Sequence, residues 1–309
     1  MVGVFRRSLS FPNKINPSRP SKPPISHHIR SISLPCRSHP LISLLKDHIT
    51  QLKSWSSNKP QQPTSAWLCD GLTRLKDLHD SLHDLLDLPQ TQDSLRNRNQ
   101  WVETLLEDFL RLVDVYGIFQ TSVLALKEEQ SAAQVDIRRR DDSKVALYLK
   151  SRRKIAREML NLVSTIRCIS AKNYPDSVTA FIVSIGDAEL AAVISDVVEA
   201  TVMVSVALFN GIYGAFGWRK TSWRLVERLY SKKAKRVTAA EGIQELQLVG
   251  EESLWGLRKK GDEEVRIVLS KMLELEECIR GIENESERVM RSLITTRVSL
   301  LNILTNYIN

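Results

Sequence analysis

The sequence has little of what sheets and tight turns require. Only 12 glycines and 11 prolines occur in 309 residues, and seven of the prolines lie before residue 41. The rest of the chain therefore carries few turn signals, and no sustained alternation of apolar and polar residues predicts a strand. Apolar residues instead recur at spacings of three and four. This pattern predicts an all-α protein, an elongated antiparallel bundle of long helices.

Cysteine motifs are also missing. The four cysteines, Cys36, Cys69, Cys168 and Cys278, are far apart and form no CxxC pair. They indicate reduced intracellular thiols rather than a disulfide framework. We find no phosphate-binding loop, activated nucleophile or carboxylate cluster, so we predict no enzymatic activity and no cofactor.

One arrangement has the spacing of a metal site. His79 and His83 lie four residues apart on a predicted helix, which is a geometry that can chelate zinc. No third ligand is apparent, and aspartate stands where the HExxH motif has glutamate. We therefore expect no metal, with one imidazole near the edge of the core and the other in water.

Acidic residues are absent from the first 40 positions, which carry seven Lys or Arg. These account for most of the net charge of +8, because the remaining chain has 37 bases against 36 acids. A nearly neutral body gives no argument for nucleic-acid binding. The tail, residues 1–38, is rich in Pro, Ser and Arg and poor in apolar residues, so we predict that it is disordered. A helical domain is expected over 39–309.

Two strings in the tail share one pattern, RSLSFP at 7–12 and RSISLP at 30–35. Each places an arginine three residues before a serine and a proline two residues after it: Arg7, Ser10 and Pro12, and Arg30, Ser33 and Pro35. The pattern suits a kinase with an acidic groove, and the phosphorylated form resembles the motif that 14-3-3 dimers bind. Two copies would allow bivalent binding.

Two other interpretations of the tail stay open. A tail rich in Ser, Arg and Pro produces such strings by chance. The same composition resembles an organelle transit peptide, which would place the protein in a plastid. No secretory signal is recognisable, and the cytoplasm is the location that we expect otherwise.

The longest apolar segment is 200–217, which contains no charged residue. Its 18 residues reach the lower limit for a membrane span, and Trp218 with the two bases after it resembles an interfacial anchor. Thr201, Ser205 and Asn210 are polar, however, and the amphipathic pattern upstream continues into the segment. The sequence favours a buried core helix, with membrane insertion or association as the alternative.

Other helices are predicted as packing partners of this segment, at about 40–56, 65–88, 91–138 with a kink at Gly117, 143–169, 221–230 and 263–304. The last one keeps a heptad register over roughly 60 Å, which is typical of a coiled-coil-like seam. Such a seam requires a partner helix, either within the chain or in a second copy. Residues 231–263 are predicted to form a mobile charged insertion with one weak helix through Leu246 and Leu254.

The first half of the helix at 143–169 is basic. It carries Lys144, Lys150, Arg152, Arg153, Lys154 and Arg157, with Arg152 as the polar interruption of the apolar seam. These residues form either a solvated helix face or a patch for anionic lipid or an acidic partner. No interleaved aromatic residues indicate single-stranded nucleic acid.

Three strings together resemble the plant-specific BYPASS-like family: RSISLPCRSHP at 30–40, LLDLP at 85–89 and RVSLLNIL at 297–304. The similarity runs from about residue 28 to the end, with Cys36 as a departure where a small polar residue is expected. The resemblance implies an all-helical plant protein linked to root and shoot development, without an established enzymatic activity. It offers no catalytic residues. We therefore expect a developmental regulator that acts through protein–protein interaction, or alternatively a membrane-associated protein anchored by 200–217.

Overall fold

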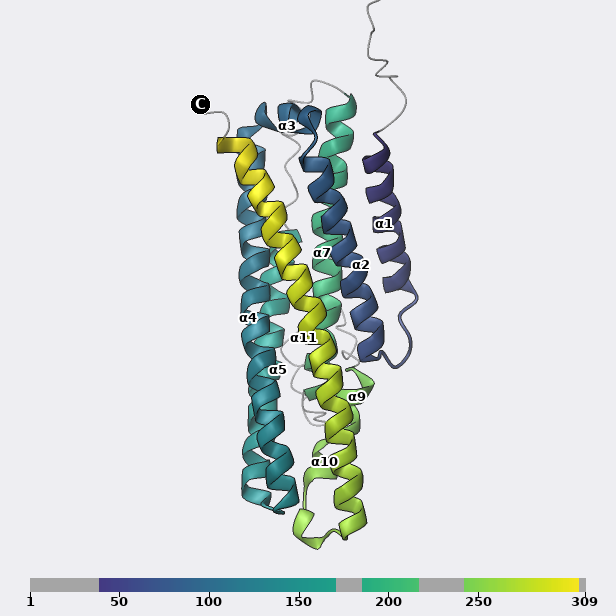
Figure 1. Ribbon diagram of the computed structural model, residues 1–309, viewed down its shortest axis with the longest axis vertical. Helices are drawn as coiled ribbons and strands as arrows, with labels where there is room; N and C mark the ends of the chain where they lie inside the picture. Colours follow the sequence, from purple (N-terminus) through teal and green to yellow (C-terminus); the bar gives the residue numbers. More distant parts are fainter. Residues whose placement is uncertain (1–38, 171–184, 217–241, 306–309) are drawn as a thin grey trace, which may run out of the picture. The chain divides into compact units, whose positions relative to one another are not determined.

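The computed structural model describes residues 39–170, 185–216 and 242–305, in which long helices lie side by side (Figure 1). The helices are α1 (Pro40–Ser57), α2 (Ser65–Leu86), α3 (Pro89–Arg96), α4 (Asn99–Arg138), α5 (Asp142–Ser170), α7 (Ile185–Phe216), α9 (Gln244–Leu248), α10 (Glu251–Leu254) and α11 (Asp262–Thr305), with a 3-10 turn η1 (Leu257–Lys259) before α11. The described residues contain no strand, which confirms the predicted all-α bundle. The tail and the predicted helix at 221–230 lie outside these residues.

Local chemistry places the helix ends. The Thr64 side chain accepts a hydrogen bond from the Trp67 amide at 3.2 Å and begins α2. Pro89 begins α3, because its missing N–H is not needed in a first turn. Between α4 and α5 the chain reverses at Arg140, which has a φ of 54°, and the Asp141 carboxylate then accepts from the Ser143 amide at 3.1 Å.

The helix predicted over 91–138 is interrupted at 97–98, between α3 and α4. The α4 helix is continuous through Gly117. At the interruption the Asn97 side-chain amide donates to the Asp93 carbonyl at 3.0 Å, and Arg98 leaves helical geometry with φ −134° and ψ 43°. An asparagine side chain that bonds to a terminal carbonyl competes with the helix.

Neighbouring helices are mostly antiparallel, but α2 and α11 run parallel. Hydrogen bonds join Thr73 to Glu285 and Asp80 to Ser292, so both partners advance in the same direction. On its other side α11 runs antiparallel to α4, where Gln120 bonds to Ser286 and a second pair, Gln134 and Glu276, lies further along α4 and earlier on α11. The seam of α11 is thus filled within one chain, and α2 and α4 are its partners.

The apolar stripes predicted for α2, α5 and α11 are buried. On α5 they comprise Val145, Tyr148, Ile155, Met159, Leu162, Ile166 and Ile169, and on α11 Val268, Met272, Leu275, Ile279, Ile282, Val289, Leu293 and Leu300. On α1, Leu44 is exposed while Ile42 and Trp55 are buried. The Trp55 ring stacks on Trp67 of α2 with centroids 4.2 Å apart, so the side of α1 that carries Trp55 faces α2.

The helix α7 fills the interior between α1, α2, α4 and α5, as predicted for a core helix. Its residues Val204, Leu208, Phe209 and Ile212 are buried. Two described segments, Asn99–Arg138 and Gly186–Phe216, are long and apolar enough to cross a membrane, with 44% and 61% of their most apolar windows buried. The same length and composition occur in core helices, so this finding alone does not distinguish the two environments.

The described part of the predicted charged insertion, 242–263, packs onto the bundle. Ile243, Leu246, Val249, Leu254 and Leu257 are buried, and the Ile243 amide donates to the Gly211 carbonyl of α7 at 3.0 Å. The single helix expected through Leu246 and Leu254 is two helices, α9 and α10, interrupted at 249–250. The sequence did not predict that these apolar side chains are buried, because they lie among many charged residues and follow no single helical period.

Candidate functional site

The residues predicted to bind a 14-3-3 dimer, Arg7, Ser10, Pro12, Arg30, Ser33 and Pro35, all lie outside the described residues. The site that the structure does describe is a set of polar side chains at the contacts between helices. We build it from the interior outward.

His79 and His83 lie one turn apart on α2 but contact different helices. The His79 Nε2 atom is 2.9 Å from Thr201 Oγ1 of α7, whereas His83 Nδ1 is 2.9 Å from Ser299 Oγ of α11. His79 is fully buried, so it lies deeper than the core-edge position expected from the sequence. Among the described residues no group of three or more His, Cys, Asp or Glu is placed to hold a metal ion.

The hydrogen bonds around His79 define its tautomer. The Thr201 hydroxyl donates to the Val197 carbonyl at 2.7 Å, so its oxygen accepts from the Nε2–H of His79. The Nδ1 atom then carries a lone pair, and it is buried without a hydrogen-bond partner. Burial disfavours the charged imidazolium and lowers the pKa of His79 from 6.5 to about 4. His79 is therefore a neutral structural donor at neutral pH.

A second hydroxyl of α7, one turn further on, repeats this arrangement. Ser205 donates to the Thr201 carbonyl at 2.7 Å, so its oxygen accepts from the Tyr116 hydroxyl of α4 at 3.0 Å. Burial raises the pKa of Tyr116 well above its usual value, and the phenol stays protonated. The two hydroxyls tie α7 to α2 on one side and to α4 on the other.

Gln130 joins three helices at the other end of α4. Its Nε2 donates to the Met272 carbonyl of α11 at 3.0 Å, and its Oε1 accepts from the Tyr148 hydroxyl of α5. All three side chains are buried. Because an unpaired amide in this position would cost about 1–3 kcal/mol, the triple contact fixes the register of α4, α5 and α11.

Arg152 of α5 binds the backbone of the segment that contains α9. Its guanidinium is buried and donates to the carbonyls of Leu246, at 3.0 Å, and Val249. It also lies 4.1 Å from the ring centroid of Phe216, at the end of α7. These carbonyls belong to the C-terminal end of α9, where a cation is favoured. The sequence identified Arg152 as a polar interruption but gave no sign of its partners.

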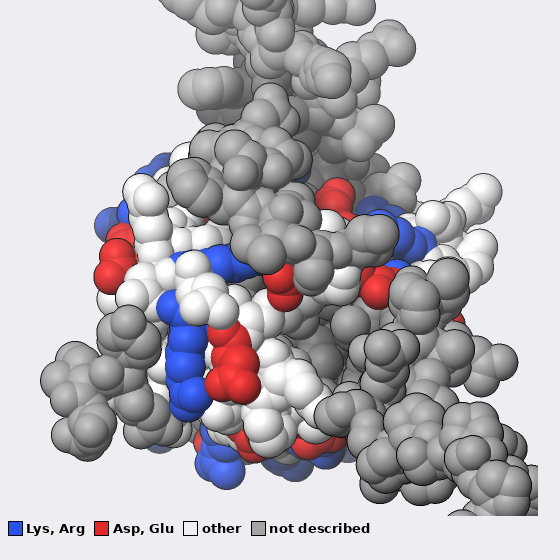
Figure 2. Space-filling model, turned by 90° about the horizontal axis from the view of Figure 1, so that it is seen from above, with Lys and Arg blue, Asp and Glu red and all other residues white. Residues whose placement is uncertain are grey.

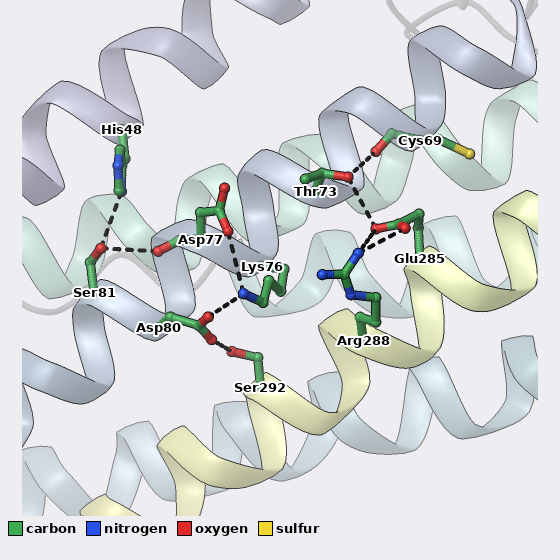
Figure 3. A network of polar contacts seen from close by, with 10 residues as sticks. All are labelled: His48, Cys69, Thr73, Lys76, Asp77, Asp80, Ser81, Glu285, Arg288 and Ser292. Atoms are coloured by element: carbon green, nitrogen blue, oxygen red, sulfur yellow. Dashed lines mark hydrogen bonds and ion pairs between the residues drawn. The ribbon is translucent and has the colours of Figure 1, made fainter.

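The seam between α2 and α11 carries polar contacts seven residues apart (Figure 3). Thr73 Oγ1 donates to Glu285 at 3.0 Å, and Ser292 donates to Asp80 at 2.7 Å. A third and longer contact of 3.5 Å joins Ser299 to Asp87. A repeat of seven on both partners is the register of a parallel coiled coil, and the heptad pattern of α11 predicted a seam of this kind.

Asp80 of this seam contacts both Lys76 of its own helix and Ser292 of α11. Partial burial raises its pKa, but the hydrogen bonds from Lys76 and Ser292 outweigh this and hold the pKa below its usual value. At the next residue, the Ser81 hydroxyl lies 3.3 Å from His48 Nδ1 and connects α2 to α1 (Figure 3). These contacts orient the helices relative to one another.

The thiols of this seam are not activated. Cys69 lies 3.6 Å from the position that a Cβ on Gly281 of α11 would occupy, and burial raises its pKa to about 11. Burial also raises the pKa of Cys278. The thiolate is the nucleophilic form, so neither cysteine is poised for attack at neutral pH.

Charges of both signs are intermixed on the described surface at the end of the bundle seen in Figure 2. Along α11 the pairing is regular, since Arg280, Arg288 and Arg291 each contact a glutamate three or four residues earlier. This agrees with the nearly neutral body computed from the sequence. Intermixed charge gives no long-range field of one sign at this end.

Comparison with known proteins gives one match. A family model described as "Protein BPS1" covers residues 71–303. No curated protein and no solved structure matches the chain. The matched range begins within α2 and ends near the end of α11, so it includes the His79, Gln130 and Arg152 contacts and most of the α2–α11 seam.

Proposed function

The chain belongs to the BPS1 family, the BYPASS-like family of plants, and we propose that it is a non-enzymatic regulator of root and shoot development. It acts by binding other proteins and is cytoplasmic. The observation that carries this proposal is the family match over most of the helical bundle.

The chemistry of the interior supports a role without catalysis. His79 and Tyr116 have pKa values that burial shifts away from neutrality, and each is bonded to a hydroxyl of α7. The Cys69 thiol is protonated for the same reason. Perturbed groups of this kind mark an active site when they line a cleft, but here they lie between packed helices. Such groups hold a scaffold together.

The binding element in this proposal is the tail. Phosphorylation of Ser10 and Ser33 would add roughly −1.5 to −2 charges at each and create ligands for the arginine clusters of a 14-3-3 dimer. The serines are 23 residues apart. A flexible link of this length averages roughly 25–30 Å, and binding both grooves multiplies the affinity by about 10² or more.

Affinity purification from root tissue tests this mechanism. We expect 14-3-3 proteins to copurify with the wild-type chain, and mass spectrometry to find phosphate on Ser10 and Ser33. The double variant Ser10→Ala/Ser33→Ala should no longer copurify with 14-3-3 proteins. The double variant Ser8→Ala/Ser31→Ala, which alters nearby serines, should still copurify with them. If neither Ser10 nor Ser33 is ever modified, or if both double variants behave alike, the proposed mechanism is wrong.

The second candidate is a membrane-associated protein anchored by 200–217. The apolar window of Gly186–Phe216 favours it. If α7 were to leave the bundle, the hydrogen bonds of Thr201 to His79 and of Ser205 to Tyr116 would have to break. Carbonate extraction separates the two candidates: an anchored chain stays with the membrane pellet, and release of all the protein into the supernatant contradicts an anchor.

A further inference from the structure

Three basic side chains on the outer face of α5 have no acidic partner within the described part of the chain. Lys150, Lys154 and Arg157 are exposed, and none forms a salt bridge with any described residue. The exposed arginines of α11 differ, because each is paired with a glutamate on its own helix. From 143 to 167 the only acid of α5 is Glu158, which accepts a hydrogen bond from Ser122 of α4 at 2.9 Å. Among the residues that the structure describes, the charges of these three side chains are therefore not paired.

The same surface is also apolar. Leu147, between the bases of α5, is 63% exposed, the highest value among the exposed large apolar side chains. On the outer face of α4, Ile118, Leu124 and Val135 are between 41% and 50% exposed. From 118 to 135, Glu128 is the one charged residue at the exposed positions of α4. Such exposed side chains are part of the reason that only 44% of the most apolar window of α4 is buried.

The two helices are neighbours. The helices α4 and α5 pack side by side and antiparallel, joined by Gln130 with Tyr148 and by Ser122 with Glu158. We call the combined surface the α4–α5 face, defined by Ile118, Leu124, Val135, Leu147, Lys150, Lys154 and Arg157. A basic stripe beside an apolar one is the arrangement of helices that lie in the plane of a membrane surface.

We propose that the α4–α5 face docks on the surface of an anionic lipid bilayer. Lys150, Lys154 and Arg157 contact the acidic headgroups, while Leu147 and the apolar residues of α4 reach the boundary with the acyl chains. The bundle stays intact and α7 stays inside it, so this mode of binding differs from anchoring by 200–217. The charge selects an anionic surface, and the apolar stripe selects lipid over a purely polar ligand.

Vesicle sedimentation with the full chain tests this proposal. We expect binding to vesicles of phosphatidylcholine mixed with phosphatidylserine, weak binding to phosphatidylcholine alone, and release by salt. The variant Lys150→Gln/Lys154→Gln/Arg157→Gln should bind the mixed vesicles about 100-fold more weakly. Leu147→Ser, which keeps all charges, should bind about tenfold more weakly.

The matched control is Arg280→Gln/Arg288→Gln/Arg291→Gln, which removes the same charge from paired positions on α11. It should bind as the wild type does, and the basic tail is present in every variant, so its contribution cancels. Circular dichroism and the melting temperature must match the wild type for each variant compared. Equal losses in both triple variants, unchanged binding in the α5 variant, or binding of poly-glutamate but not of the mixed vesicles would each overturn the proposal.

Discussion

Replacing His79 with leucine should flatten the acid side of the stability curve. The imidazole is buried and neutral, and burial lowers its pKa from 6.5 to about 4. Between these values the unfolded chain binds a proton that the folded chain does not bind, so the free energy of unfolding falls as the pH falls. Each pKa unit corresponds to about 1.4 kcal/mol, which gives a loss of about 3 kcal/mol from pH 7 to pH 4.

The leucine variant lacks this proton linkage but also lacks the hydrogen bond to Thr201. At pH 7 His79→Leu should therefore be about 1 kcal/mol less stable than the wild type. Near pH 4 the order reverses, and the variant should be about 2 kcal/mol more stable, because the wild type alone has lost about 3 kcal/mol. The two stability curves cross between these pH values.

Urea unfolding at intervals from pH 7 to pH 4 measures both curves. The difference between the variants isolates His79, since every carboxylate that titrates in this range is common to both. His83→Leu, one turn further along α2, is the matched control, because it removes an imidazole that bonds to Ser299 of α11 instead of Thr201 of α7. Parallel curves for wild type and His79→Leu would refute the assignment of the acid loss to this imidazole.

Three further substitutions test the packing. A Cβ at Gly71 would lie 2.3 Å from the Trp55 ring, so Gly71→Ala should lower the free energy of unfolding by about 2 kcal/mol. The same change at Gly117, where the nearest atom is 3.9 Å away, should raise it by about 0.5–1 kcal/mol, and urea unfolding that ranks the two alike would contradict the glycine geometry. Arg152→Met leaves two buried carbonyls unpaired and should cost about 3 kcal/mol. Hydrogen exchange should then speed up first in α9, whereas Lys150→Met on the exposed face should leave it unchanged.

Much of the bundle was predictable because α5 and α11 keep one apolar period over many turns. Residues such as Met159 and Ile279 are buried where the spacing placed them. Arg152 was recognised as a polar interruption of that period, and so its burial fits the pattern. Long regular helices are the elements in which local spacing alone decides which side chains face inward.

The features that the sequence did not predict depend on individual side-chain contacts rather than on a regular apolar period. The break at 97–98 depends on one asparagine side chain that bonds to a carbonyl, for which no Gly or Pro provides a signal. The depth of His79 depends on Thr201, which is far away in sequence. The helices that pack on α11 could not be predicted for the same reason. A heptad pattern shows that a helix has an apolar seam but does not identify the helix that packs against it.

The parallel pairing of α2 with α11 has a consequence for how the chain is made. Partners on this seam are 212 residues apart, as Thr73 and Glu285 are. At about 5–20 residues per second, a ribosome needs roughly 10–40 s to add the stretch between them. During that interval the side of α2 that packs on α11 is exposed to solvent. The emerging polypeptide can therefore aggregate or bind chaperones until α11 leaves the exit tunnel.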